Sequence, residues 1–162
     1  MKITFIQTGG TIDKDYPKKI KGYAFEISEP AVGRIIEKLN PSFEYEIISV
    51  LKKDSLEITD EDRDKIKDMC KKTKNDKIII THGTDTMLET AKAISEIKDK
   101  TIIITGAMRP ERFSNSDAPI NIGTAIGAIN ALENGVYIAM QGIVFRWDKC
   151  TRNMITGQFV ST

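Results

Sequence analysis

The chain has 162 residues, of which 40% are hydrophobic and 29% are charged, and its formal net charge at pH 7 is +1. This length fits one domain with its own core, and the balanced charge gives no reason to expect a nucleic acid or an anionic membrane surface as a partner. No run of sequence approaches the roughly 18 consecutive apolar residues that a membrane-spanning helix needs.

Strand-like and helix-like segments alternate along the first half of the chain. Residues 3–7 predict a buried first strand, and a Thr-Gly-Gly-Thr segment follows at once. Residues 13–27 are polar and rich in lysine, tyrosine and glycine, which predicts a mobile loop with residues 13–26 as the natural lid. The Ser-Glu-Pro segment at 28–30 predicts a helix with a serine cap and a proline in its first turn. Residues 45–51 predict the second strand.

The second half of the chain continues this alternation. Thr59, which is followed by three acids, predicts the cap of another helix. Residues 77–81 and 101–105 are short, apolar and β-branched, as in strands that are covered on both faces. Two further helices and a fifth strand follow the same pattern: residues 87–97, 120–132 and 136–140. Residues 143–145 indicate a short extra strand, and the rest of the C-terminal segment predicts irregular structure.

The alternation predicts the fold class. Strands that alternate with helices indicate an α/β fold in three layers, α/β/α, around a mainly parallel, flavodoxin-like sheet with strand order 2-1-3-4-5. Such sheets bind ligands outside the carboxyl ends of their strands, at the point where the strand order reverses. The crevice between the first and third strands would then be lined by Thr11, Thr84 and Asp85.

Each candidate at this edge also has a structural interpretation. The two glycines before Thr11 permit a backbone N–H to approach a ligand, but they would equally suit a plain strand-end turn. Asp85 follows the third strand, where it would either cap the next helix or hold a cationic group of a small substrate. Asp54 and Ser55 would either bind polar groups of a ligand or form a turn. These alternatives remain open from the residues alone.

The histidine and the two cysteines are weaker candidates for functional residues. His82 is the sole histidine and directly follows an apolar strand, so we interpret it as a structural residue. Cys70 and Cys150 have no paired spacing, which predicts reduced thiols and neither a metal site nor a disulfide framework. The apolar run at the N-terminus is too short for a signal peptide, so the expected compartment is the cytoplasm.

Taken together, the motifs resemble the N-terminal domain of the bacterial-type L-asparaginase family. The matching segments stand in the family's order: Thr-Gly-Gly-Thr-Ile at 8–12, Asp-Ser at 54–55, His-Gly-Thr-Asp-Thr-Met at 82–87, Gly-Ala-Met-Arg-Pro at 106–110 and Ser-Asp-Ala-Pro-Ile-Asn at 116–121. The resemblance runs over nearly the whole chain. It implies a single asparaginase N-terminal-type domain over residues 1–162, in a short form that lacks the family's second, C-terminal domain.

The resemblance also implies an activity, the release of ammonia from the side-chain amide of L-asparagine and, in some members, of L-glutamine. Thr11 resembles the family's primary nucleophile, and Tyr23 resembles the tyrosine that closes over it. Thr84 and Asp85 resemble the second catalytic group. The substrate-binding positions that the resemblance implies are Gly10, Asp54, Ser55 and Asp85.

The implied mechanism is covalent catalysis. Thr11 would attack the amide carbon and form an acyl-enzyme, and water activated near Thr84 would hydrolyse the ester. Backbone N–H groups of the glycine-rich loops would stabilise the oxyanion. The implied chemistry needs neither a metal nor an organic cofactor.

Two departures from the family pattern matter. The family places a lysine after the fifth strand, and the closest position here is Arg152, with Lys149 as the alternative if the segment is shifted. Arginine stays protonated and cannot act as a neutral base. The second departure is the missing second domain. In longer members the resemblance implies that the second domain of a neighbouring subunit helps to enclose the substrate amine. We expect a homo-oligomer, because a single domain would leave the crevice open.

Three functions therefore remain open. The first is an amidohydrolase that acts on a small amino-acid amide, asparagine or glutamine. The second is a non-catalytic amino-acid-binding domain of the same fold, motivated by Arg152. The third is an amidase that acts on a glutaminyl group of a larger molecule, although the near-neutral charge argues against tRNA as that molecule.

Overall fold

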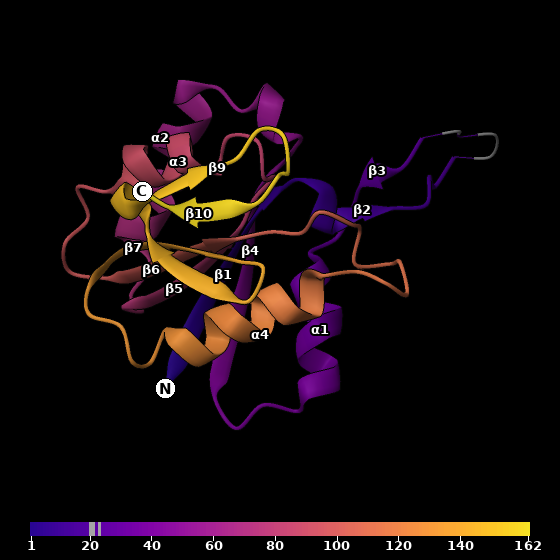
Figure 1. Cartoon of the computed structure of the whole chain (residues 1–162). Coiled ribbons are helices and arrows are strands. Elements are labelled where there is room, and N and C mark those ends of the chain that lie inside the picture. Colours follow the sequence, from indigo (N-terminus) through magenta and orange to yellow (C-terminus); the bar gives the residue numbers. More distant parts are fainter. Residues whose placement is uncertain (20–21, 23) are drawn as a thin grey trace.

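The computed structural model describes residues 1–19, 22 and 24–162. Its centre is a six-stranded sheet in the order β4-β1-β5-β6-β7-β8 (Figure 1). The parallel strands are β1 (Lys2–Gly9), β4 (Glu44–Lys53), β5 (Lys77–Thr81), β6 (Thr101–Thr105) and β7 (Gly135–Met140). At one edge β8 (Ile143–Arg146) pairs antiparallel with β7. The predicted order 2-1-3-4-5 and the extra strand are confirmed.

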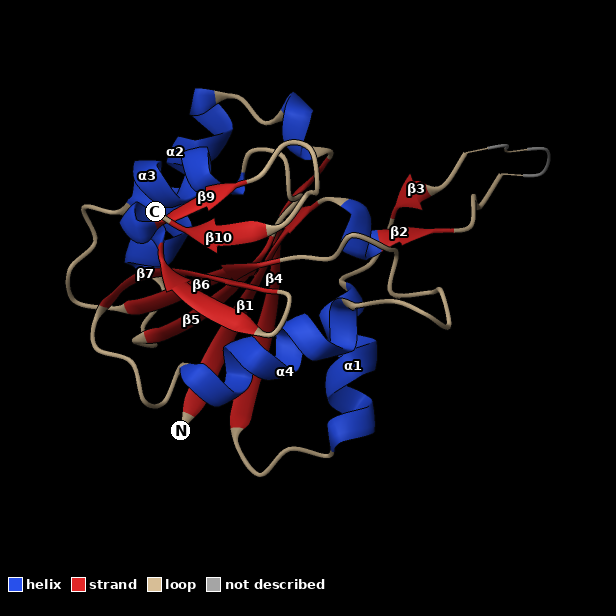
Figure 2. Cartoon of the chain, viewed as in Figure 1, coloured by secondary structure: helices blue, strands red, loops and turns tan. Residues whose placement is uncertain are grey.

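Helices cover both faces of the sheet, which confirms the three-layer arrangement (Figure 2). One face is covered by α1 (Ala31–Leu39) and α4 (Ala118–Ala128), and the other by α2 (Asp60–Lys72) and α3 (Met87–Ile94). α2 begins as predicted, with Thr59 and Asp62 forming a capping box. α3 and α4 end several residues earlier than their apolar patterns predicted.

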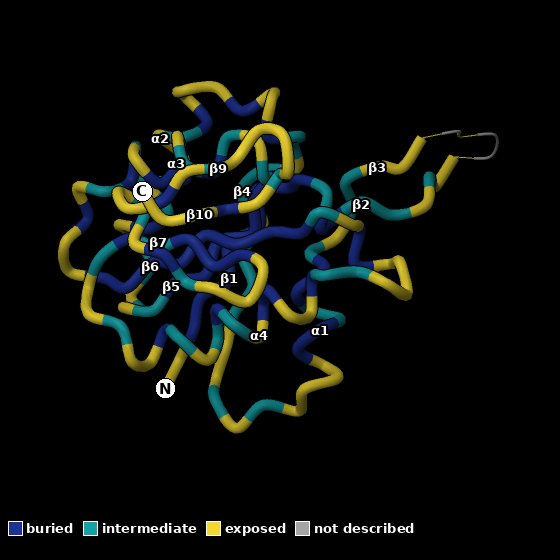
Figure 3. The backbone as a smooth tube through the Cα atoms, in the orientation of Figure 1, coloured by how far each residue is buried: buried dark blue, intermediate teal, exposed yellow. Residues whose placement is uncertain are grey.

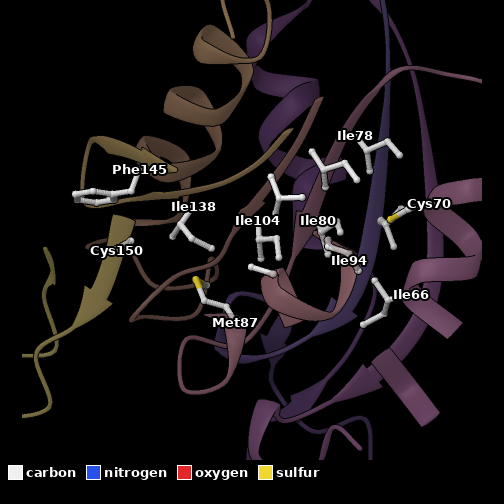
Figure 4. Packing of buried hydrophobic residues seen from close by; sticks show 14 of the residues in the cluster. Ile66, Cys70, Ile78, Ile80, Met87, Ile94, Ile104, Ile138, Phe145 and Cys150 are labelled. Atoms are coloured by element: carbon white, nitrogen blue, oxygen red, sulfur yellow. The ribbon is translucent and has the colours of Figure 1, made fainter. Parts of the chain in front are cut away.

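The isoleucine runs explain why the sheet is covered on both faces. Successive side chains of a strand point to opposite faces. Ile78 and Ile80 of β5 therefore pack with α2 and α3 (Figure 4). Ile79 packs on the opposite face, with α1 and α4. All three side chains are fully buried. Apolar residues on both faces of a strand are buried when a helical layer covers each face. The polar residues are therefore left to the loops at the ends of the sheet.

The start of α1 differs from the prediction. The helix begins at Ala31 with Pro30 at its N-cap position, so Ser28 does not cap it. Instead, Oδ1 of the buried Asp13 accepts a hydrogen bond of 2.8 Å from the Ala31 N–H. A carboxylate from a distant segment thus satisfies a donor that the proline beside it cannot satisfy.

Two segments predicted as irregular contain short hairpins. At residues 13–27 the prediction of a loop is wrong at both ends, because β2 (Lys14–Asp15) pairs antiparallel with β3 (Glu26–Ile27). The rings of Tyr16 and Phe25 meet edge to face, 5.4 Å apart, next to this pairing. Near the C-terminus β9 (Cys150–Arg152) pairs antiparallel with β10 (Phe159–Ser161). The second hairpin lies over the carboxyl ends of the parallel strands (Figure 1).

Candidate active site

The turns after β1 and β5 are in direct backbone contact. Gly9 and Gly10 have φ angles of +112° and +85°, a region that side chains rarely adopt. A Cβ atom on Gly10 would lie 2.4 Å from the Cα of Gly83, and one on Gly9 would lie 2.4 Å from the carbonyl oxygen of Lys53. Glycine is therefore required at both positions for the turn after β1 to pass between its two neighbours.

This contact brings the two predicted threonines to the same place. Thr11 begins the 3-10 helix η1 (Thr11–Asp13), one residue after Gly10. Thr84 stands one residue after Gly83, and both threonines are partly exposed. The expectation that the loops of strands one and three meet at the carboxyl edge is thus confirmed. The interpretation of the Thr-Gly-Gly-Thr segment as a plain turn does not account for its close contact with the second loop.

Ser55 joins the same cluster from the end of β4. It begins the 3-10 helix η2 (Ser55–Glu57) and is buried. A Cβ on Gly83 would lie 2.6 Å from the Ser55 hydroxyl oxygen, and the Thr86 hydroxyl donates to the Ser55 carbonyl over 2.7 Å. Asp54 caps η2 by accepting from the Leu56 N–H at 3.2 Å, and its other oxygen lies 3.4 Å from Lys14 Nζ. Ser55 faces the cluster, whereas Asp54 is engaged in both a turn and an ion pair.

Asp85 does not cap α3. Thr86 occupies the N-cap position of that helix, and the Asp85 carboxylate instead accepts from Arg152 Nη1 at 2.5 Å. The guanidinium of Arg152 lies 6.0 Å from the ring centre of Phe159, and the β9–β10 hairpin holds it there. The Arg152 side chain is only 18% exposed and that of Asp85 is 43% exposed. Lys149 lies in η3 (Trp147–Lys149) and is exposed, so the contact to Asp85 belongs to Arg152.

His82 has a structural role. Its Nδ1 bonds the Gly83 carbonyl and its Nε2 bonds the Thr90 hydroxyl, each at 2.8 Å. A carbonyl oxygen can only accept, so Nδ1 carries the proton and Nε2 accepts from Thr90. Complete burial lowers the pKa of His82 to about 4, which keeps the ring neutral. The imidazole thereby ties the Gly83 turn to α3.

Sequence reasoning missed two acids that organise the loops. Burial raises the pKa of Asp13 to about 7, and its hydrogen bond to Ala31 joins η1 to α1. Asp117 accepts from the N–H groups of Met108 and Arg109 at 3.0–3.1 Å and from Asn121 Nδ2 at 2.9 Å. Asp117 stands at the N-cap position of α4, but its carboxylate shapes the loop after β6 instead of capping the helix. Neither role leaves a periodic signal in the sequence.

A hydrogen-bonded path links that loop to the hairpin that carries Arg152. Asn121 Nδ2 donates to the Gly106 carbonyl at 2.9 Å, and its Oδ1 accepts from the Gln141 N–H at 2.9 Å. Gln141 Oε1 in turn accepts from the Phe159 N–H at 3.0 Å. The Gly-Ala-Met-Arg-Pro and Ser-Asp-Ala-Pro-Ile-Asn segments therefore support the position of β10, and through β10 that of Arg152.

Three further points concern Tyr23, metal-binding groups and membrane-spanning helices. Tyr23 lies outside the described residues. Among residues 1–19, 22 and 24–162, no group of three or more histidine, cysteine, aspartate or glutamate side chains is arranged to hold a metal ion. Within the same residues, every helix is too short or too polar to cross a bilayer.

Comparison with known proteins agrees with this fold and arrangement. A family model described as asparaginase, N-terminal, matches residues 2–157. A glutaminase-asparaginase of Acinetobacter glutaminasificans is 29% identical over 173 residues, which cover 98% of this chain and 52% of that protein. One component of a glutamyl-tRNA(Gln) amidotransferase of Methanococcus vannielii is 45% identical over 67 residues, 40% of this chain and 16% of that protein.

The same likeness holds in three dimensions. The thermostable L-asparaginase from Thermococcus kodakarensis superimposes with a TM-score of 0.86 at 27% identity, covering 99% of this chain and 51% of that one. The chain thus spans about half the length of the Acinetobacter and Thermococcus proteins. Because the family model covers nearly all of its residues, the chain belongs to the asparaginase family and corresponds to the family's N-terminal region.

Proposed function

We propose that this protein is an amidohydrolase that releases ammonia from the side-chain amide of asparagine, and also of glutamine, with Thr11 as the nucleophile. The observation that carries the proposal is the backbone contact between Gly10 and Gly83, since it sets Thr11 and Thr84 in adjacent turns. Membership of the asparaginase family supports the reaction type, and the name of the Acinetobacter relative includes both activities.

The proposed reaction has two steps. Thr11 Oγ1 forms an ester with the side-chain carbonyl carbon, the C–N bond breaks, and the proton from the hydroxyl leaves on ammonia. Water near Thr84 then adds to the ester, releases the carboxylic acid and restores the Thr11 hydroxyl. Backbone N–H groups of the two glycine turns are the expected donors to the oxyanion. Gly10, Ser55 and Asp85 are the proposed substrate contacts, together with Asp54.

Arg152 is proposed to act as a fixed positive charge. Its guanidinium stays protonated, so it holds the Asp85 carboxylate without removing a proton from Thr84 or from water. Tyr23 and Lys149 remain candidates for the site by resemblance alone.

The test is ammonia release from L-asparagine and L-glutamine by the parent protein, Thr11→Ala and Thr11→Ser. Thr11→Ala should abolish release, while Thr11→Ser keeps a hydroxyl and should retain part of it. Circular dichroism of all three proteins checks that the fold is intact. A folded parent protein that releases no ammonia, or a Thr11→Ala variant with full activity, would refute the proposal.

The ion pair between Asp85 and Arg152 also favours a second candidate, a non-catalytic amino-acid-binding domain. By resemblance Arg152 takes the place of the family's lysine, and a guanidinium that stays protonated would impair turnover while leaving ligand binding possible. In that case L-aspartate should raise the melting temperature of a protein that shows no turnover. Without such a shift, this second candidate fails.

The proposed setting is the cytoplasm, and the proposed assembly is a homo-oligomer. Light scattering of the purified protein tests the assembly, because a monomer at micromolar concentration would contradict it. Fractionation of the source cells tests the compartment.

A further inference from the structure

The turn between β7 and β8 contains a residue that its shape does not favour. Met140 pairs with Ile143, so Gln141 and Gly142 form a two-residue turn. Their φ angles are +56° and +79°, as in the type I′ turn that joins many antiparallel strands. Asparagine, aspartate or glycine is preferred at the first of these positions, because most other side chains crowd the backbone at positive φ. The turn by itself therefore gives no reason for a glutamine.

The hydrogen bonds of Gln141 give that reason. Its side-chain Oε1 accepts a bond of 3.0 Å from the N–H of Phe159 in β10. Its own N–H donates over 2.9 Å to Oδ1 of Asn121, a fully buried residue of α4. Gln141 is thus anchored on α4 and holds β10. An asparagine would suit the turn, but its side chain is shorter by one C–C bond of about 1.5 Å and would not reach the Phe159 N–H.

Phe159 in turn lies directly beside Arg152. The two residues are opposite each other in the β9–β10 pairing, and the Arg152 guanidinium lies 6.0 Å from the Phe159 ring centre. Arg152 Nη1 then donates to the Asp85 carboxylate. Most of the hairpin is exposed (Figure 3), although Phe159 itself is buried. Exposed segments with few buried residues open easily, so the bond from Gln141 matters to where Arg152 lies.

We propose that Gln141 is a positioning residue for the reaction. Its side-chain amide fixes β10, and through Phe159 it holds the guanidinium of Arg152 against Asp85. This inference rests on the proposed amidohydrolase function, in which Arg152 supplies a fixed positive charge at the site. The strained backbone of Gln141 is the cost of a side chain long enough to reach β10.

The experiment replaces Gln141 with asparagine, glycine and glutamate. Gln141→Asn and Gln141→Gly suit the positive φ but remove the acceptor from Phe159, whereas Gln141→Glu keeps an oxygen at the same reach. We expect kcat for ammonia release from L-asparagine to fall roughly tenfold or more in the first two variants and to be largely kept in the third. Relief of the backbone strain offsets the lost hydrogen bond, so the urea midpoint should change little in all three.

Two NMR measurements report on the positioning without depending on turnover. Hydrogen exchange of the Phe159 amide should be faster by roughly tenfold or more in Gln141→Asn than in the parent protein. The Nε–H signal of Arg152, whose Nε is buried, should broaden or shift in the same variant. Asn40→Gly is the matched control, because Asn40 also has a positive φ, +46°, but lies at the C-cap of α1. It should change neither signal nor kcat.

The outcomes separate this inference from the proposed function. Full turnover of Gln141→Asn, or a fall in kcat only as large as the loss of folded protein in urea, would make Gln141 a purely structural residue. Unchanged Phe159 exchange together with an unchanged Arg152 signal would overturn the link from Gln141 to Arg152. If the parent protein releases no Thr11-dependent ammonia, the proposed function fails, and the two NMR signals still decide whether Gln141 positions Arg152.

Discussion

Arg152 Nη1 donates a hydrogen bond of 2.5 Å to Asp85 Oδ1 and so joins the C-terminal hairpin to the loop after β5. The pair is held from both sides, because β10 supports Arg152 through Phe159 and the contacts of Ser55 with Gly83 and Thr86 steady the loop that carries Asp85. An arginine here keeps a positive charge beside Asp85 but cannot release its proton.

Arg152→Lys should raise the turnover of the proposed reaction. Lysine keeps the positive charge beside Asp85 and adds an amine that can lose its proton, and a positioned base accelerates proton transfer substantially. We expect kcat to rise by roughly tenfold or more, with a new dependence on pH on the alkaline side. Steady-state ammonia release across pH measures both effects.

The matched control is Arg146→Lys, an arginine in β8 that pairs with the exposed Asp148 at 2.8 Å. It should leave turnover unchanged. A large fall in turnover for Arg152→Lys would show that the guanidinium itself is required, and the interpretation of Arg152 as a replaced lysine would then be wrong.

Gly10→Ala should destabilise the protein and abolish activity. The positive φ of +85° and the 2.4 Å approach to Gly83 leave no room for a methyl group, so the turn that carries Thr11 must move. We expect the free energy of unfolding to fall by about 2 kcal/mol or more in a urea titration.

Gly127→Ala is the control for this substitution. A Cβ at Gly127, within α4, meets nothing within 4 Å. Alanine in a helix is favoured over glycine, so this variant should gain up to about 1 kcal/mol. Equal effects of the two substitutions would contradict the close contact between the turns.

Asp13 should give the protein a stability that decreases as pH rises from about 4 to 7. The pKa of Asp13 is raised by burial from 3.8 to about 7, so the folded protein keeps this proton after the unfolded chain has lost it. Ionisation therefore costs stability across that interval, and the cost is constant above pH 7. The interval corresponds to at most about 4 kcal/mol.

Asp13→Asn should remove this decrease, as measured by urea unfolding between pH 4 and 8. His82 contributes the opposite slope, because burial lowers its pKa to about 4 and stability is lost as the pH falls below its ordinary value of 6.5. Subtracting the variant from the parent at each pH cancels the His82 contribution. A difference that stays constant with pH would refute the buried ionisation of Asp13.

Thr90→Val should destabilise the protein through His82. The Thr90 hydroxyl is the donor to Nε2, and valine would leave a buried acceptor without a partner. The expected loss is about 1–3 kcal/mol in the free energy of unfolding. Thr124→Val replaces a partly exposed helix threonine and should stay within about 0.5 kcal/mol of the parent. Equal losses in the two variants would remove the argument that His82 is structural.

The prediction of the sheet succeeded because its signals are local. The isoleucine runs of β5 and β6 are short and β-branched, which identifies strands covered on both faces whatever the rest of the chain does. The polar segment that becomes β2 and β3 carries no such pattern, and its pairing depends on contacts such as that between Tyr16 and Phe25. The start of α1 was misplaced for the same reason, since its donor is satisfied by a distant acid.

By itself the sequence determined the order of strands and helices, the parallel sheet and the edge at which Thr11, Thr84 and Asp85 gather, because apolar periodicity and glycine turns act within a few residues. Only the tertiary structure decided that Asp85 pairs with Arg152 rather than capping α3, and that Asp13 supports α1 from a distance. Pairing and burial depend on residues that meet only after the chain has folded. Charges and hydrogen bonds at the site therefore cannot be read from spacing along the chain.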